Sequence, residues 1–254
     1  PPPIYGLYHS EEVVGEALRH IDRDKVILST KCGLEWRHES PVLHKVVDGV
    51  QTYRDLSAKS IIEDVEDSLR RLGTDHLDVL YTHWQTPDLS IFPLEETVEA
   101  MMKLKEQGKI RAIGASNTTA EFIRGYCKYG QLDVIQEKYS LLTRRVEKQL
   151  LPTCKELGVS VQAYSPLEQG LLTGKVTMET TYPRGQHPQL EPQLPAGAPL
   201  SGAGYAGKME RPDREIRLLS GTAGHRPDRP HDPRPACAVR CPHSAAGNGQ
   251  RRCR

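Results

Sequence analysis

The 254-residue sequence has no long apolar run: no stretch approaches the roughly 18 consecutive apolar residues that a membrane-spanning helix needs. It also has no secretory signal, which would combine a basic start, an apolar segment and a small-residue cleavage site. These absences argue against a membrane protein, and we expect no membrane partner. Because the chain begins with three prolines and no methionine, we expect its natural start to be missing.

Cysteine residues are few and irregularly spaced. Six occur, and those in the first part of the chain, Cys32, Cys127 and Cys154, lie singly inside helix-like or strand-like segments. This pattern favours reduced thiols over a disulfide framework, so we expect a cytoplasmic protein.

Residues that build a hydrophobic core become scarce after residue 182. Residues 183–254 hold 11 of the 19 prolines, one aromatic residue and eleven arginines against one lysine. Their net charge is near +6, whereas that of residues 1–182 is near −5. Because this stretch also lacks hydrophobic periodicity, we expect an ordered part over 1–182 and a low-complexity, disordered tail over 183–254.

The tail allows three further interpretations. A frameshift near Gly185 would explain the abrupt change in composition, and intact mass or resequencing of the gene would decide it. The arginines can bind nucleic acid, but prolines interrupt the basic run. Cys237, Cys241 and His243 can ligate a metal ion, but a second pair of cysteines at zinc spacing is lacking. We therefore expect no nucleic acid partner and no metal.

Residues 1–182 contain regular helix and strand patterns. Apolar stripes at helical spacing predict a helix over 146–157 and four more helices, which begin at Ser10, Ser57, Pro93 and Thr119. Short β-branched runs between the helices predict strands over residues 26–31, 77–84, 110–117, 134–139 and 159–167. Alternation of strands and helices indicates a parallel sheet with right-handed crossovers.

The absence of one glycine motif narrows the fold class. An open dinucleotide-binding sheet normally has G-x-G-x-x-G after its first strand, and the sequence has no such motif. The pattern instead predicts an α/β protein with an incomplete (β/α)₈ TIM barrel, of which five of eight strands are recognisable. Residues 33–56 are polar and long for a strand-to-helix connection, so we expect a functional loop over a site.

Polar side chains follow successive strands of this predicted barrel. They are Lys31, His83, Ser116, Asn117, Gln136 and Tyr164, with Tyr5 in the loop before the first helix. Because the carboxyl ends of barrel strands converge on one face, we expect these residues to be neighbours. An ammonium group beside a phenol favours the phenolate, so we expect Lys31 to lower the pKa of Tyr5. His83 would orient the carbonyl group that receives the proton.

The motifs around these residues resemble those of the aldo-keto reductase family. They are Ile4-Tyr5-Gly6, Ser29-Thr30-Lys31, Tyr81-x-His83-Trp84, Ile113-Gly114-x-Ser116-Asn117, Gln136 and Tyr164-Ser165-Pro166-Leu167. The resemblance covers residues 3 to about 185. Residues 165–174, with Thr82-His83-Trp84-Gln85, are most similar to bacterial members that reduce methylglyoxal or other small aldehydes.

This resemblance implies an NAD(P)H-dependent reduction of small aldehydes or ketones to alcohols, with the hydride supplied by the nicotinamide. Tyr5 would be the general acid, Lys31 the group that tunes it and His83 the residue that orients the substrate carbonyl. Trp84 and Trp36 are candidates for the wall of the substrate pocket.

The resemblance also implies a set of cofactor-binding residues. Ser116, Asn117 and Gln136 would hold the nicotinamide carboxamide, and Tyr164 would stack on the nicotinamide ring. The residues along the pyrophosphate would be Ser165, Leu167, Gln169 and Gly170. The choice between NADH and NADPH stays open, because the loop that grips the adenosine ribose would fall in the tail.

The sequence departs from the family at both ends. The family aspartate that pairs with the lysine would precede Pro1, so we expect a large loss of activity without it. The alternative is therefore a non-catalytic nucleotide-binding barrel fragment or interaction subunit, which would not need that carboxylate. A gene remnant whose product does not fold is a third interpretation, since missing strands leave sheet edges open. The oligomeric state stays open.

Overall fold

The structure is a computed structural model that describes residues 2–47, 49–174 and 238–239. Its main sheet has five parallel strands in the order β1-β5-β6-β7-β8. They are β1 (Ser29–Cys32), β5 (Leu77–Thr82), β6 (Ile110–Ser116), β7 (Val134–Lys138) and β8 (Ser160–Tyr164). The predicted five-stranded parallel arrangement of an incomplete TIM barrel is confirmed. The tail as a whole lies outside the described residues, apart from β9 (Ala238–Val239), which pairs antiparallel with β8.

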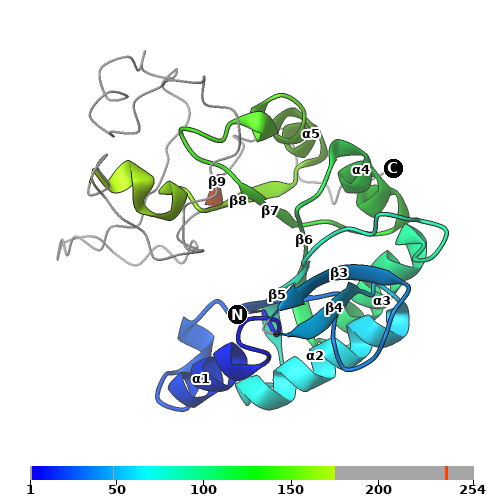
Figure 1. Cartoon of the computed structure of the whole chain (residues 1–254), viewed down its shortest axis with the longest axis vertical. Helices are drawn as coiled ribbons and strands as arrows, with labels where there is room; N and C mark the ends of the chain where they lie inside the picture. Colours follow the sequence, from blue (N-terminus) through cyan, green and yellow to red (C-terminus); the bar gives the residue numbers. More distant parts are fainter. Residues whose placement is uncertain (1, 48, 175–237, 240–254) are drawn as a thin grey trace, which may run out of the picture.

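The strands form an arc with the helices along its outer side (Figure 1). These helices are α1 (His9–Leu18), α2 (Ala58–Leu72), α3 (Leu94–Glu106), α4 (Ala120–Tyr129) and α5 (Leu150–Leu157). Short 3₁₀ turns occur at η1 (Arg23–Lys25), η2 (Arg145–Glu147) and η3 (Glu168–Thr173). In the described part of the chain, no helix has the length and apolar character to cross a bilayer.

Two of the predicted helix starts are confirmed by side-chain caps. Ser57 Oγ accepts a hydrogen bond from the Ser60 N–H at the start of α2, and Thr119 Oγ1 accepts one from the Phe122 N–H at the start of α4. The predicted cap at Ser10 is wrong, because α1 already begins at His9 and is preceded by Tyr8, whose side chain makes no cap bond. The predicted 146–157 helix is divided into η2 and α5.

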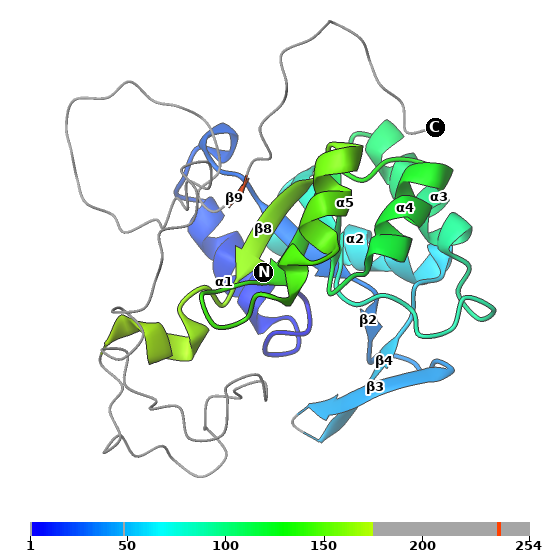
Figure 2. The ribbon, with the colours of Figure 1, turned by 90° about the horizontal axis from the view of Figure 1, so that it is seen from above.

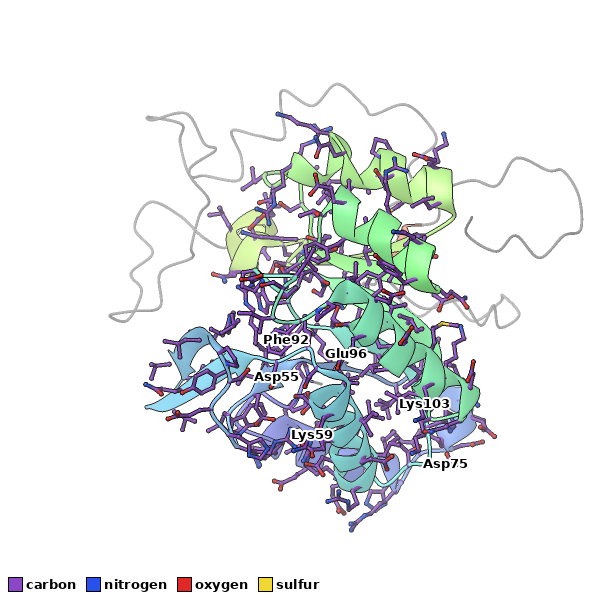
Figure 3. The ribbon with its side chains drawn as sticks, turned by 90° about the vertical axis from the view of Figure 1, so that its right-hand side faces the viewer. Asp55, Lys59, Asp75, Phe92, Glu96 and Lys103 are labelled. Atoms are coloured by element: carbon purple, nitrogen blue, oxygen red, sulfur yellow. The ribbon has the colours of Figure 1, made fainter. Side chains whose placement is uncertain are left out.

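Helices α2 and α3 lie side by side and run in the same direction (Figure 3). Lys59 and Glu96 mark their N-terminal ends, and Asp75 and Lys103 lie toward the opposite end. A carboxylate oxygen of Glu96 accepts a hydrogen bond from the Ala58 N–H, 3.0 Å away, which satisfies a donor at the start of α2. This pairing fixes the two helix starts at the end of the barrel where the strands finish.

Residues 33–56 are not the loop expected from the sequence but a second, antiparallel sheet. Its order is β2-β4-β3, with β2 (Leu34–Glu35), β3 (Val42–Val47) and β4 (Val50–Arg54); we call it the small sheet. Figure 2 shows it projecting from the barrel at the end toward which β8 points. The small sheet therefore stands beside the carboxyl ends of the parallel strands.

One continuous core joins the strands to the helices. It includes Leu80 of β5, Ile113 of β6, Ile135 of β7, Met101 of α3 and Tyr126 of α4, all with less than 2% of their surface exposed. Burial of such side chains contributes about 1.5 to 3 kcal/mol each. The strands are thus held from their outer side.

Candidate active site

His83 is held in place through its backbone at the end of β5. Its N–H donates to the carbonyl oxygen of Cys32 at the end of β1, 3.0 Å away. Its carbonyl oxygen accepts a hydrogen bond of 2.9 Å from Asn117 Nδ2, after β6. The ends of three strands therefore fix the backbone from which the imidazole projects, and its two ring nitrogens make no hydrogen bond to the described residues.

The three candidate catalytic residues come together at this edge. The rings of Tyr5 and His83 are 6.1 Å apart and meet edge to face, at 77°. The ammonium nitrogen of Lys31 lies 5.9 Å from the centre of the Tyr5 ring. The imidazole of His83 and the ammonium group of Lys31 thus both lie close to the Tyr5 ring, and the roles assigned to the three groups stay a prediction.

Burial controls the protonation of this trio. It lowers the pKa of His83 to about 3, with further lowering by the charge of Lys31, so the imidazole is neutral at pH 7. Burial also lowers the pKa of Lys31 to about 8. Burial raises the pKa of Tyr5, so its net shift is opposite to the lowering expected from Lys31, whose own effect on the phenol stays a prediction. Tyr5 therefore stays protonated at neutral pH.

A chain of hydrogen bonds links the ends of β8, β6 and β5. The Tyr164 hydroxyl donates to Asn117 Oδ1 at 2.8 Å, and Asn117 Nδ2 donates to the His83 carbonyl oxygen. Ser116 Oγ donates to the Gln136 carbonyl oxygen at 2.8 Å. Asn117 has a φ of 52°, a left-handed conformation that asparagine tolerates better than most residues. The structure thus brings together the residues expected at the carboxamide.

Gln162 belongs to this group but was missed in the sequence. Its Oε1 atom accepts hydrogen bonds from the Tyr81 hydroxyl and from Gln136 Nε2, both 2.7 Å long. Gln162 pairs in register with Gln136 across β7 and β8. The register of β7 and β8 could have indicated Gln162, since residues opposite each other on parallel strands share a face of the sheet.

The chain after β8 contains the four residues expected along a pyrophosphate: Ser165, Leu167, Gln169 and Gly170. Positive φ angles occur at Ser165 (53°), Gln169 (54°) and Gly170 (98°), so the backbone turns tightly here. Buried Glu168 anchors the turn, because its carboxylate accepts hydrogen bonds from Ser140 and Thr143 and pairs with Lys138 at 3.2 Å. Leu167 is 55% exposed, and a side chain added at Gly170 would meet nothing within 4 Å.

The two candidate pocket tryptophans have different surroundings. Trp84 packs against His44 and Arg54 of the small sheet, with a ring-to-ring distance of 5.5 Å and a guanidinium-to-ring distance of 5.1 Å. Trp36 instead packs on Tyr8, 4.6 Å between ring centres. The structure therefore gives Trp84 a place beside His83, and it places Trp36 at the start of α1.

His44 and Arg54 were missed because the small sheet was not predicted. The signal was present: the dipeptide Asp48-Gly49 is typical of sequences that form turns between two antiparallel strands, and both flanking runs are rich in β-branched residues. Reading that signal would have predicted two antiparallel strands in the 42–54 segment.

A hollow of about 270 Å³ borders the site. It is lined by Trp84, Asn117, Thr118, Glu137, Arg145, Val146 and Leu150. A larger hollow of about 450 Å³ lies at the C-terminal half of α2 and the turn that follows it, and is not part of the site.

The exposed edges of the amide cluster suit a nicotinamide carboxamide, which needs both donors and acceptors. Gln136 Oε1 accepts no hydrogen bond from the residues that the structure describes, and Asn117 Oδ1 accepts only that of Tyr164. Gln136 Nε2 donates once and has a second hydrogen to offer. The residues present therefore fit the group.

Comparison with known proteins shows a family match over most of the chain. The model of the Aldo/keto reductase family matches residues 3–214, which extends beyond residue 185, where the resemblance seen in the motifs ends. The NADH-specific methylglyoxal reductase of Escherichia coli (strain K12) is 49% identical over 177 residues, 70% of this chain and 54% of that protein. Aldo-keto reductase YhdN of Bacillus subtilis (strain 168) is 38% identical over 204 residues, 76% of this chain and 57% of that protein.

Solved structures show the same similarity in three dimensions. The glycerol dehydrogenase AKR11B4 from Gluconobacter oxydans superimposes with a TM-score of 0.67 at 34% identity, covering 77% of this chain and 57% of that one. An aldo/keto reductase from Klebsiella pneumoniae in complex with NADP and acetate gives 0.53 at 34% identity, covering 66% and 52%. The chain spans about half the length of the relatives that it matches.

Proposed function

Because the chain belongs to the aldo/keto reductase family, we propose that it reduces small aldehydes or ketones to alcohols, with a proton from Tyr5. The observation that carries this proposal is the convergence of Tyr5, Lys31 and His83 on one space at the strand ends. A carbonyl oxygen in that space would meet a protonated phenol and a neutral imidazole.

The protonation states suit a proton transfer to that oxygen. His83, neutral at pH 7 with a pKa of about 3, can donate a ring N–H hydrogen bond to the carbonyl oxygen without taking the proton. Tyr5 keeps its proton in the resting site because burial raises its pKa. Once the proton has left, the Lys31 ammonium stabilises the phenolate.

The cofactor supplies the hydride in this family, and the amide side chains of Asn117 and Gln136 would hold the nicotinamide of that cofactor. Gln136 offers free acceptor and donor positions and Asn117 a free acceptor position, with Ser116 beside them, and Tyr164 presents a ring at the same edge. Ser165, Leu167, Gln169 and Gly170 would follow the pyrophosphate. Relatives include an NADH-specific enzyme and one that binds NADP, so either nicotinamide cofactor is compatible with the family.

Methylglyoxal is the first substrate to test. The supporting observation is the 49% identity to a methylglyoxal reductase over 177 residues, 70% of this chain. The second candidate is a nucleotide-binding barrel that does not catalyse. The observation that favours this candidate is that the chain matches only 54% of the length of the methylglyoxal reductase.

The decisive assay follows the oxidation of NADH and of NADPH by the purified chain with methylglyoxal. Tyr5→Phe is expected to lower turnover by about 100-fold or more, since general acid catalysis contributes that much. The matched control is Tyr129→Phe, an exposed tyrosine at the end of α4, which should leave turnover unchanged.

A cofactor titration followed by fluorescence separates the two candidate functions. Binding without turnover would favour the non-catalytic barrel. Turnover that survives Tyr5→Phe would refute Tyr5 as the proton donor.

A further inference from the structure

Arg54 differs from the other half-buried arginines near the barrel. Arg23, Arg37 and Arg71 each pair with a carboxylate, at 2.9 Å or less. No carboxylate among the described residues lies within 4.0 Å of the Arg54 guanidinium, yet burial lowers the pKa of this group. Arg54 has therefore lost hydration without gaining a counter-charge, which is costly unless a partner binds there.

The guanidinium is nevertheless held firmly. Its Nη1 atom donates to the Gln85 carbonyl oxygen at 2.9 Å, its Nε atom donates to His44 Nδ1 at 3.2 Å, and it lies over the Trp84 ring. A guanidinium has five N–H groups, so the outer Nη1 and Nη2 hydrogens stay available as a fork. Such a fork matches the two oxygens of a carboxylate.

His44 is aimed at the same place by an irregularity in β3. The pairing of β3 with β4 shifts between Leu43 and Lys45, and a shift of this kind redirects the residue that it skips. Because His44 Nδ1 accepts from Arg54, the ring proton must be on Nε2. Burial lowers the pKa of His44 to about 4, so at pH 7 Nε2–H is a neutral donor.

The Arg54 and His44 pair lies close to the reaction centre. Trp84, which both contact, directly follows His83. The charge of Lys45, and that of His44 once it is protonated at low pH, also contribute to the low pKa of His83, which places the small sheet within electrostatic reach of the imidazole. A molecule with its carbonyl at His83 would extend toward Arg54.

Building on the proposed function, we propose that Arg54 and His44 form a carboxylate-recognition wall, so that the preferred substrates are aldehydes or ketones that carry a carboxylate a few bonds from the carbonyl. Arg54 supplies the fork and the charge, and His44 Nε2–H adds a third donor. Neither residue touches the reacting carbonyl, so both set specificity.

The test compares 4-oxobutanoate and 5-oxopentanoate with their methyl esters, which keep the aldehyde and remove the charge. The wild-type chain should prefer at least one of the acids, and Arg54→Gln should raise its KM by about tenfold or more while kcat/KM for the ester changes less than about twofold. Lys45→Gln, an exposed neighbouring cation without such hydrogen bonds, is the matched control and should keep the preference.

Two outcomes of the kinetics would overturn the inference. If Arg54→Gln lowers kcat/KM equally for acid and ester, Arg54 only supports the small sheet. If the variant lowers neither value and keeps the wild-type ratio of acid to ester, Arg54 does not meet the substrate. In either case turnover of the esters leaves the proposed oxidoreductase function standing.

A binding measurement decides the inference even without turnover. Since the chain has two tryptophans, Trp36→Phe leaves Trp84, under Arg54, as the only one. Succinate should change the Trp84 emission in a saturable way, succinamide should not, and adding Arg54→Gln should raise the Kd for succinate about tenfold or more. No saturable response to succinate would refute the wall, whereas a response without turnover would support it and count against the proposed reaction.

Discussion

At the scale of single residues, the site is built by backbone as much as by side chains. The backbone of His83 is held in place because both its N–H and its carbonyl oxygen are hydrogen-bonded to neighbouring strand ends. Its ring nitrogens make no hydrogen bond to the described residues, and they are the atoms that we propose meet the substrate. Asn117 serves the same arrangement twice, since one end of its amide holds His83 and the other accepts from Tyr164.

Lys31 carries a stability cost that can be measured. Its pKa is lowered from 10.5 to about 8, so below pH 8 the folded chain holds a buried ammonium group. Between pH 8 and 10.5 the unfolded chain binds the proton and the folded chain does not, so stability rises with pH across that window. Lys31→Met should therefore raise the free energy of unfolding at pH 7 by about 1 to 3 kcal/mol and flatten this rise.

Urea unfolding of wild type and Lys31→Met at pH 7 and pH 9.5 checks the prediction. A variant that is less stable than wild type at pH 7 would show that Lys31 has a stabilising partner. Greater stability with loss of carbonyl reduction would identify Lys31 as a residue kept for function.

At the scale of elements, α1 is docked by one buried carboxylate. Glu11 is fully buried and accepts hydrogen bonds from Thr30 of β1 at 2.7 Å and from Ser68 and Arg71 of α2 at 2.9 and 2.8 Å. Gly15 permits the same close packing, because a side chain there would lie 2.3 Å from the Arg71 carbonyl oxygen.

Glu11→Ala is expected to lower the free energy of unfolding by about 3 to 5 kcal/mol, because it leaves Arg71 without its buried partner. The adjacent Glu12→Ala removes an exposed carboxylate and should change stability by less than about 0.5 kcal/mol. Denaturant unfolding of both variants gives the comparison, and similar values for the two would contradict the docking role of Glu11.

The inner face of the sheet depends on one glycine. A side chain at Gly114 would lie 2.3 Å from the Tyr81 ring, which occupies the adjacent register position on β5 and bonds Gln162. Gly114→Ala is therefore expected to displace Tyr81 and to destabilise the chain by about 1 to 3 kcal/mol. In a Tyr81→Ala background the same substitution should cost much less, and additive effects in this double-mutant cycle would argue against the clash.

How much the sequence could predict differs between elements. The five strands and the caps at Ser57 and Thr119 were predictable, because periodicity and capping are local signals. The Ser10 cap was not, since α1 is positioned by the tertiary contacts of Glu11 rather than by a cap. The direction of the Tyr5 pKa shift was also missed, because this shift depends on desolvation in the folded chain.

At the scale of the whole molecule, the described core runs without a break from Leu28 before β1 to Val161 in β8. A core of this kind predicts a single cooperative unfolding transition. Tryptophan emission reports the strand ends and the small sheet, and far-ultraviolet circular dichroism reports the helices. The two urea curves should coincide, and an earlier transition in emission would show that the small sheet melts separately.

The segment that forms the small sheet leaves and re-enters the barrel at neighbouring points. The Asp55 N–H donates to the Gly33 carbonyl oxygen at 3.2 Å, so the two ends of the 34–54 segment are hydrogen-bonded neighbours on the barrel. A segment that leaves and re-enters a scaffold at adjacent points can be exchanged for another of different length without altering the scaffold. In terms of protein engineering, the segment is a cassette. On the specificity role proposed for Arg54 and His44, grafting it between barrels would transfer substrate preference while Tyr5, Lys31 and His83 stay with the host.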